Sequence, residues 1–386
     1  MKKFGVVNLT LGYAFADKMI KELADNLSAV CDEKCKLFHV SRDTFVFYLS
    51  SYENKDELIK FNAFIIGIIN ATFVSKTIGA SIGIFEIENS DCDAERILKK
   101  GLIAAQYVNE YQHLGYAFFD IKMEEKLLRE ARIKNELELA VLNTGDTIFY
   151  LEYQPIINMK TNKVHSFEAL SRLKSSKLGN VSPAEFIPIA EDTQLIIPLG
   201  KLVMKQALFF LKKLENERYS DVKVALNISS IQLLRDDFII ELVNIIDETG
   251  VNASCIILEI TESLFFNNYQ EINNKIDALK SLGIEIAIDD FGTGYSSFAR
   301  ERELNVNCLK IDKYFIDKLI MLDENEVITA DIISMAHKIG HYVVAEGVEH
   351  EKQKNYLLES GCDLLQGYLF SRPVPEEDAI EFLRKF

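Results

Sequence analysis

The sequence lacks any apolar run that approaches the roughly 20 residues of a membrane-spanning helix. Its run Phe64–Ile69 (FIIGII) is far too short to span a bilayer. A signal peptide, in which a basic segment precedes a short apolar one, is also missing from the start of the chain. We therefore expect a soluble, cytoplasmic protein.

Positive charge and metal-binding cysteine patterns are scarce as well. The 43 Lys and Arg residues against 59 Asp and Glu residues give a net charge of −16. Proteins that bind nucleic-acid polymers carry basic stripes, so we expect no such partner. The six cysteines include no CxxC pair and are typical of reduced thiols. Cys31 and Cys35 are spaced poorly for zinc. His337 and His341 lack the Glu of a zinc-binding helix, so we expect no zinc site from either pair.

Eight short apolar runs occur in the last two-thirds of the chain, and each ends on acidic, amide or basic residues. In chain order they are Phe149–Pro155, Val164–Arg172, Val222–Ser229, Ile256–Glu262, Ile284–Asp290, Cys308–Asp312, Tyr342–Glu346 and Leu364–Tyr368. Strands that alternate with helices and carry polar residues at their carboxyl ends are what a (β/α)8 barrel needs, because its reacting groups project from those ends. The length of 386 residues and the 48% apolar content suit two domains. We predict an α/β chain whose C-terminal part is a TIM-like barrel.

Most polar residues at these strand ends are acidic. They are Glu168, Glu259, Glu262, Asp289, Asp290, Glu346 and Glu349. Several ionised carboxylates in one cleft repel one another, and a divalent cation relieves that repulsion. Oxygen ligands without a Cys/His cluster favour Mg²⁺ or Mn²⁺ over zinc. Asn227 adds a neutral carbonyl oxygen to this set. The sequence therefore predicts a metal site.

The adjacent pair Asp289 and Asp290 indicates two ions, because neighbouring carboxylates at a strand end allow one residue to bridge both. Two ions a few ångströms apart suit in-line attack on a phosphodiester. Lys310 follows the next strand and could orient the attacking water. A single carboxylate at a strand end is often a helix cap or a surface charge, and a lone lysine there is usually solvated. The number and spacing of the acidic residues favour the metal site.

Seven short motifs in this region carry a resemblance to a known family. They are EALSR from Glu168, NIS from Asn227, EITES from Glu259, DDFGTGYSS from Asp289, LKID around Lys310, AEGVE around Glu346 and QGYLFSRP from Gln366. From about Tyr150 to its end, the chain resembles the EAL family of cyclic di-GMP phosphodiesterases, in the family's order and with no catalytic motif missing.

The resemblance implies a role for each matching residue. The residues implied to bind the two metal ions, Mg²⁺ or Mn²⁺, are Glu168, Asn227, Glu259 and Asp289 for one ion and Asp289, Asp290 and Glu346 for the other. The implied catalytic residues are Glu346, Lys310, which contacts the attacking water, and Glu262, which holds the loop Phe291–Ser297. The residues implied to line the substrate cleft are Gln154, Arg172, Asp312, Glu349 and Gln366, with Arg172 suited to a phosphate oxygen. The implied reaction is hydrolysis of one phosphodiester bond of cyclic di-GMP to the linear dinucleotide 5′-pGpG.

Two other functions stand beside hydrolysis. A non-catalytic receptor for cyclic di-GMP typically loses a metal carboxylate or the lysine of this family, whereas this chain keeps them all. A protein-interaction scaffold would be free to lose the loop glycines, and Gly292 and Gly294 are present. The sequence therefore favours an active phosphodiesterase over a receptor or a scaffold.

The first 120 residues predict a different, smaller α/β module. Its predicted elements are a helix at Ala16–Val30, a β-like segment at Lys36–Leu49, a helix from Glu57, a strand at Ile78–Ile87 and a helix at Ala94–Tyr111. This layout resembles a GGDEF domain, with segments from Phe4 and His39 in register with the family's motifs. Ser41–Phe45 (SRDTF) stands where Gly-Gly-Asp-Glu-Phe would, so we predict a degenerate domain without cyclase activity.

This module also begins after the family's first strand, which raises the interpretation that the chain is part of a longer protein. A structural or dimerising remnant is favoured over a GTP-binding regulator. Between the modules, Lys122–Leu142 has apolar residues at helical spacing and predicts one amphipathic helix. We place the degenerate GGDEF-like domain at 1–120, a helical linker at 121–144 and the EAL domain at 145–386. The resemblance implies a homodimer through the EAL domain, where Arg300–Glu303 (RERE) departs from the family's pattern.

Overall fold

The chain forms two compact units, Met1–Arg129 and Glu130–Phe386, and each has its own sheets and hydrophobic core. The computed structural model describes residues 12–41, 43–72, 79–88, 93–108, 114–262, 264, 269–292, 305–321 and 327–386. Within these stretches, no helix combines the length and the apolar character needed to cross a membrane.

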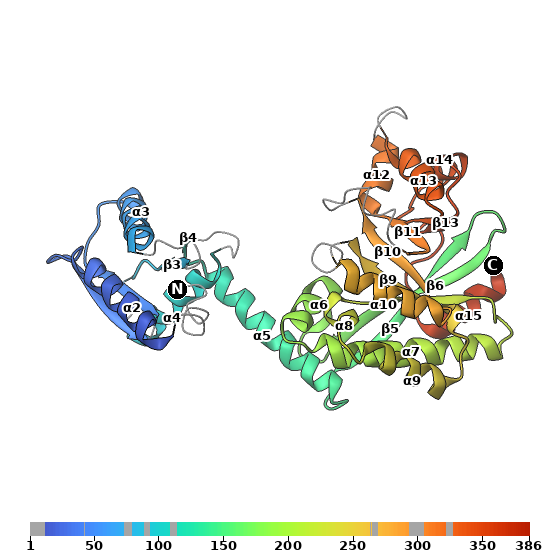
Figure 1. Cartoon of the computed structure of the whole chain (residues 1–386), viewed down its shortest axis with the longest axis horizontal. Helices are drawn as coiled ribbons and strands as arrows, with labels where there is room; N and C mark the ends of the chain where they lie inside the picture. The colour runs from blue at the N-terminus through green and yellow to red at the C-terminus, as the bar shows by residue number, and fades with distance from the viewer. Residues whose placement is uncertain are drawn as a thin grey trace. The chain divides into compact units, whose positions relative to one another are not determined.

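The second unit is built around a closed barrel of eight strands (Figure 1). The strands are β5 (Ile148–Asn158), β6 (Lys163–Ser175), β8 (Lys223–Asn227), β9 (Ile256–Thr261), β10 (Glu285–Phe291), β11 (Cys308–Ile311), β12 (Tyr342–Ala345) and β13 (Leu364–Gln366). Their order is β5-β13-β12-β11-β10-β9-β8-β6, and β5 pairs with β6 to close the ring. The short strand β7 (Gly179–Val181) is added at the edge of β6. Each of the eight predicted apolar runs overlaps one of these strands, and the predicted α/β barrel is confirmed.

One strand departs from the alternation of strand and helix that the sequence predicts. Strand β5 is antiparallel to both of its neighbours, β6 and β13, whereas the other barrel strands pair in parallel. Only residues 159–162 join β5 to β6, and parallel strands need a crossover of a dozen or more residues. Asn162 adopts a positive φ of 52° in this turn, and the Asn158 side chain accepts hydrogen bonds from the backbone N–H groups of Lys160 and Thr161. The short link therefore makes a hairpin.

Helices cover the outside of the barrel. They are α6 (Pro183–Asp192), α7 (Ile196–Asn216), α8 (Ser230–Leu233), α9 (Phe238–Thr249), α10 (Tyr269–Ser281), α12 (Lys313–Met321), α13 (Thr329–Lys338), α14 (Glu351–Glu359) and α15 (Glu376–Lys385), with a 3-10 turn at η1 (Ala253–Cys255). Alternate residues of β8 show how both strand faces are buried. Val224 and Leu226 pack in the large core shared with the helices, and Ala225 packs in a smaller core inside the barrel. Burial on both faces explains why the strands are near-continuous apolar runs.

Helix α5 (Ile121–Val141) contains the boundary between the two units. In its C-terminal half, Ile133, Leu137 and Ala140 are buried in a core shared with α6 and β6. The helix lies where the sequence predicts an amphipathic linker. The domain limits of 1–120, 121–144 and 145–386 stay a prediction.

A buried carboxylate fixes this half of α5 to the barrel unit. The Glu136 side chain is 4% exposed and accepts hydrogen bonds from Thr147 Oγ1, from Ser175 Oγ at 2.8 Å and from Lys177 Nζ at 3.2 Å. These bonds, led by the one from Thr147, outweigh burial and lower the pKa of Glu136. Thr147 precedes β5 and Ser175 ends β6, so Glu136 ties the helix to both strands.

The described part of the first unit holds two separate two-stranded sheets. Its elements are α2 (Tyr13–Ser28), β1 (Cys35–Ser41), β2 (Thr44–Leu49), α3 (Lys55–Thr72), β3 (Ala80–Ile84), α4 (Ala94–Gln106) and β4 (Leu114–Phe118). Strands β1 and β2 are antiparallel, and β3 and β4 are parallel. The predicted β-like segment Lys36–Leu49 is thus two strands joined by a turn. Arg42 and residues 4–11 of the segment from Phe4 lie outside the described residues.

Candidate functional site

Neighbouring strands bring the predicted acidic residues to one end of the barrel. Asn227 of β8 is level with Glu259 of β9, and Asp289 of β10 is level with Thr261 of β9. Glu168 of β6 lies beside Ala225 of β8. Neighbouring parallel strands have their carboxyl ends on the same side of the barrel. Polar residues near those ends therefore lie close to one another.

Lys310 on β11 lies at the centre of this acidic cluster. Its Nζ is 2.6 Å from Glu346 Oε1, 2.7 Å from Glu259 Oε2, 3.3 Å from Asp289 Oδ1 and 3.8 Å from Glu168 Oε1. The lysine side chain is 1% exposed. A lone lysine at a strand end is usually solvated, but Lys310 lies within β11 and its buried ammonium is surrounded by carboxylates.

The cluster carries more negative charge than one ammonium balances. Burial is the main cause that raises the pKa of Glu259 well above its usual value and that of Glu346 to about 8. Burial opposes the charge on Lys310, but the acidic residues around it, Asp289 first, raise its pKa well above the usual value. Buried carboxylates that resist ionisation indicate missing positive charge, which a divalent cation supplies.

Two amide side chains hold Glu168 in place. Asn227 Nδ2 donates to Glu168 Oε1 at 2.7 Å, and Gln366 Nε2 donates to Glu168 Oε2 at 2.6 Å. Gln366 Nε2 also donates to Gln154 Oε1 at 3.0 Å, and Gln154 Nε2 donates to the Ser371 carbonyl at 3.0 Å. Burial would raise the pKa of Glu168, but Lys310 and the two amides outweigh it and lower that pKa. Glu168 is therefore held as the carboxylate.

The donor set fits a hard divalent cation in its chemistry. Its ligand atoms are carboxylate and amide oxygens, which Mg²⁺ and Mn²⁺ prefer. The buried Gln366 Oε1, which neighbours this set, has no hydrogen-bond partner. Over the part of the chain that the structure describes, no group of three or more His, Cys, Asp or Glu side chains is arranged so that it could hold a metal ion as it stands. The carboxylates are instead grouped around the Lys310 ammonium.

Backbone strain marks the predicted pair Asp289 and Asp290. The register between β10 and β11 shifts between Ile288 and Phe291, and Asp290 has a positive φ of 55°. Such irregularities re-aim side chains and often occur beside active sites. Asp290 is consequently exposed while Asp289 turns toward Lys310.

Glu262 directly follows β9 and contacts the start of the loop that follows β10. It is 5% exposed, and its Oε2 accepts a hydrogen bond from the Gly292 backbone N–H at 3.0 Å. Gly292 has a φ of 89°, a conformation that side-chain-bearing residues rarely adopt. The rest of the predicted loop, including Gly294, and the segment Arg300–Glu303 lie outside the described residues.

Three predicted substrate residues, Arg172, Asp312 and Glu349, have partners outside the Lys310 cluster. Arg172 Nε donates to Glu152 Oε2 at 2.7 Å, and its Nη1 donates to the Ser171 carbonyl at 3.0 Å. Asp312 accepts from the Tyr314 N–H at the start of α12. Asp312 also helps to raise the pKa of Asp290, after burial and Asp289, so it lies near that pair.

Glu349 is an exposed residue of the predicted site and forms an ion pair with Lys313. Its side chain is 38% exposed and Oε1 lies 2.9 Å from Lys313 Nζ. The hydrogen bond from Lys313 is the main cause that lowers its pKa. Sequence reasoning missed Lys313 and also Glu152, the partner of Arg172. Strand alternation could have found Glu152, since it shares a face of β5 with Gln154.

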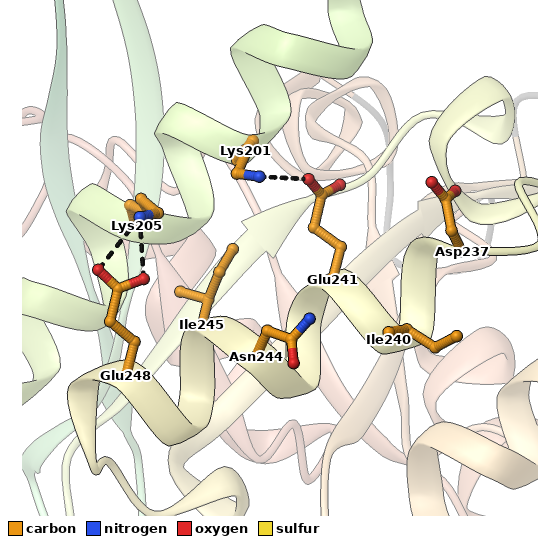
Figure 2. A pocket seen from close by; sticks show the side chains of 8 residues that line it. All are labelled: Lys201, Lys205, Asp237, Ile240, Glu241, Asn244, Ile245 and Glu248. Carbon is orange, nitrogen blue, oxygen red and sulfur yellow. Dashed lines mark hydrogen bonds and ion pairs between the residues drawn. The ribbon is translucent and has the colours of Figure 1, made fainter.

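A cavity of about 250 Å³ lies elsewhere, between α7 and α9 (Figure 2). Its lining residues are Lys201, Lys205, Asp237, Ile240, Glu241, Asn244, Ile245 and Glu248. Lys201 Nζ lies 3.0 Å from Glu241, and Lys205 Nζ lies 2.9 Å from Glu248. These cations and anions pair with one another across the cavity, which contains none of the predicted site residues.

Comparison with known proteins agrees with the architecture. The family model described as EAL domain matches residues 135–373, more than half of the chain. The model described as Diguanylate cyclase, GGDEF domain matches residues 1–110. Among solved structures, PaMucR Phosphodiesterase, c-di-GMP complex, is 31% identical with a TM-score of 0.61 and covers 64% of this chain and 99% of that chain.

Two curated relatives match along nearly the whole chain. Signaling protein YkoW of Bacillus subtilis is 32% identical, over 99% of this chain and 48% of that protein. Cyclic di-GMP phosphodiesterase NbdA of Pseudomonas aeruginosa is 31% identical, over 99% of this chain and 49% of that protein. The chain thus spans about half the length of these relatives. With the acidic cluster in place and the family model matched over most of the barrel unit, the chain belongs to the EAL family, with a GGDEF domain at its amino-terminal end.

Proposed function

We propose that this chain hydrolyses one phosphodiester bond of cyclic di-GMP and releases the linear dinucleotide 5′-pGpG. The observation that carries the proposal is the convergence of four carboxylates on the buried Lys310 ammonium in a barrel of the EAL family. The relatives support the substrate, since NbdA is named a cyclic di-GMP phosphodiesterase and the PaMucR structure is a phosphodiesterase complex with c-di-GMP.

Two divalent cations, Mg²⁺ or Mn²⁺, belong to the proposal. The residues proposed to hold them are Glu168, Asn227, Glu259 and Asp289 for one ion and Asp289, Asp290 and Glu346 for the other. Such ions supply neutralisation of the phosphate charge and activation of water. The unbalanced negative charge of the cluster and the orphaned Gln366 Oε1 support their presence.

Lys310 is proposed to position the attacking water as a hydrogen-bond donor. The acidic residues around it raise the pKa of its ammonium, so it stays charged and cannot act as the base. Glu346 lies 2.6 Å from Lys310 Nζ, so this proposed metal ligand and the proposed water-positioning lysine are adjacent.

The substrate cleft is assigned to residues around this centre. Arg172 is half-buried and held in one orientation by Glu152 and Ser171, so its guanidinium is ready to bind a phosphate oxygen. The other residues proposed to contact substrate are Gln154, Asp312, Glu349 and Gln366. Glu262 is proposed to hold the loop that begins at Gly292 through the hydrogen bond to its N–H.

The test is incubation of the purified chain with cyclic di-GMP and Mg²⁺ or Mn²⁺, with chromatographic separation of the nucleotides. A parallel sample contains EDTA. The proposal predicts 5′-pGpG in the metal-containing samples alone. Intact cyclic di-GMP with both metals, in a sample that binds the nucleotide tightly, would contradict hydrolysis and indicate a receptor.

We also propose that the GGDEF domain of this chain makes no cyclic di-GMP. The support is the sequence SRDTF at Ser41–Phe45, which has lost the glycines and one acidic residue of the family's motif. The test is incubation with GTP and Mg²⁺ while Glu168→Ala prevents degradation of any product. Accumulation of cyclic di-GMP would contradict the proposal.

A further inference from the structure

Two thiols lie in contact in the first unit. Cys31 follows the C-terminal end of α2, and Cys35 is the first residue of β1. Their Sγ atoms are 3.7 Å apart, and both cysteines are free. A disulfide bond is about 2.05 Å long, so the sulfurs need to approach by about 1.7 Å to form one.

The backbone between the two cysteines is fixed by Asp32. Its Oδ1 accepts hydrogen bonds from the N–H groups of Lys34 at 2.8 Å and Cys35 at 2.9 Å. The Cys31 N–H donates to the Ser28 carbonyl at 3.1 Å. Both cysteines are therefore held near one another by the turn, and the contact of their sulfurs is a property of the local fold.

The two thiols differ in exposure. Cys35 is 5% exposed, whereas Cys31 is half-buried and reachable from solvent. Burial, followed by the hydrogen bond with Cys31, raises the pKa of Cys35 to about 12. A solvent-borne reagent therefore meets Cys31 first, and Cys35 stays a protonated thiol until its neighbour has reacted.

We propose that Cys31 and Cys35 form a dithiol site that small-molecule disulfides oxidise to an intramolecular disulfide. The Cys31 thiolate attacks one sulfur of the reagent, so that a mixed disulfide forms and one thiolate leaves. Cys35 Sγ then attacks Cys31 Sγ, its proton passes to the departing sulfur, and the second thiol leaves. The protein loses two protons and two electrons, and the reagent disulfide takes them up and is reduced to two thiols.

Oxidation would join the end of α2 covalently to the start of β1. The site lies in the GGDEF domain and uses none of the residues assigned to hydrolysis. The inference is therefore independent of the proposed phosphodiesterase activity.

The sequence offers a direct test, because Lys34 lies between the two cysteines and trypsin cleaves after it. The full chain is incubated with oxidised glutathione at about pH 8.5, where thiolates form. Remaining thiols are alkylated, and the unfolded protein is digested without reductant. The expected result is one species in which the peptide ending at Lys34 is linked to Cys35–Lys36, about 2 Da lighter than the two peptides together. Reductant should separate them.

Two variants sharpen the test. Cys35→Ser removes the second thiol, so Cys31 should keep a glutathione adduct that the wild type loses. Cys255→Ser removes a half-buried thiol that has no cysteine partner in the described structure, and the Cys31–Cys35 link should form as in the wild type. The proposal is overturned by a stable glutathione adduct on wild-type Cys31, by Cys35 that stays open to alkylation, or by a disulfide to Cys92.

Discussion

Lys310 shows how much one residue decides in this site. A fully buried ammonium is stable only with charged partners, and Lys310 has four carboxylates within 4 Å. The same ammonium keeps the carboxylates together in the described structure. Lys310 is therefore expected to serve stability as well as the proposed reaction.

The first prediction concerns removal of that ammonium. Lys310→Met should lower the free energy of unfolding by about 3 kcal/mol or more without metal, because it leaves buried carboxylates without a counter-charge. Lys352→Met on the exposed surface of α14 is the control and should change stability by less than about 0.5 kcal/mol. Urea unfolding in EDTA measures both. Equal, small losses in the two variants would refute the stabilising role.

The second prediction concerns His165 on β6. Burial, and then Lys223, lowers its pKa to about 4 from an ordinary value of 6.5. The unfolded chain binds the proton more tightly, so this contribution to stability is full above about pH 6.5 and is lost as the pH falls toward about 4. In His165→Gln the unfolding free energy should therefore fall less steeply than in the wild type over that interval. If the unfolding free energies of wild type and His165→Gln fall equally steeply between about pH 6.5 and pH 4, the effect is ruled out.

At the scale of residues, the sequence predicted which side chains gather in the acidic cluster better than it predicted their burial and their partners. The acidic residues and Asn227 were found because polar groups end apolar strands. The burial of Lys310 was missed, because a lysine in a strand gives no sign of the carboxylates that surround it. Glu152 and Lys313 were missed because each matters only through a partner distant in sequence, Arg172 and Glu349.

At the scale of elements, the strands were predicted more securely than their directions. Burial on both faces of β8 to β13 produces apolar runs that periodicity detects. The reversed direction of β5 follows from the short link of residues 159–162. That link indicates an antiparallel hairpin only once β5 and β6 are known to pair. The β-like segment Lys36–Leu49 was likewise read as one element, because the turn between β1 and β2 has no glycine or proline to mark it.

The third prediction tests the attachment of α5. Glu136→Gln should lower the free energy of unfolding by about 1–3 kcal/mol, since it removes a buried charged acceptor of three hydrogen bonds. Glu138→Gln on the exposed face of the same helix is the matched control and should cost less than about 1 kcal/mol. Denaturant unfolding distinguishes them. A Glu138 variant as unstable as the Glu136 variant would show that helix charge alone accounts for the loss.

At the scale of the whole molecule, the net charge of −16 opposes an anionic substrate. The proposed substrate, cyclic di-GMP, can approach only if local positive charge outweighs that field. Among the described residues that pair with the cluster, Lys310 is the cation, and its neighbours already neutralise it. Binding of substrate is therefore expected to depend on metal.

The fourth prediction follows from this balance. Each Mg²⁺ ion, at about 100 times its dissociation constant, should stabilise the folded chain by about 2.7 kcal/mol, because it binds the folded state alone. NaCl at the same ionic strength is the control and should give a much smaller shift in melting temperature. Glu168→Ala, which removes a proposed ligand, should reduce the Mg²⁺ effect. Equal shifts with Mg²⁺ and NaCl would contradict specific binding.

The most direct test of the central claim compares wild type and Glu168→Ala in the hydrolysis of cyclic di-GMP. Both proteins are assayed with Mg²⁺ and with Mn²⁺, after circular dichroism has shown that the variant is folded. The account predicts 5′-pGpG from the wild type and no detectable product from the variant. A variant that hydrolyses cyclic di-GMP at the wild-type rate would contradict the assignment of the carboxylate cluster as the catalytic metal site.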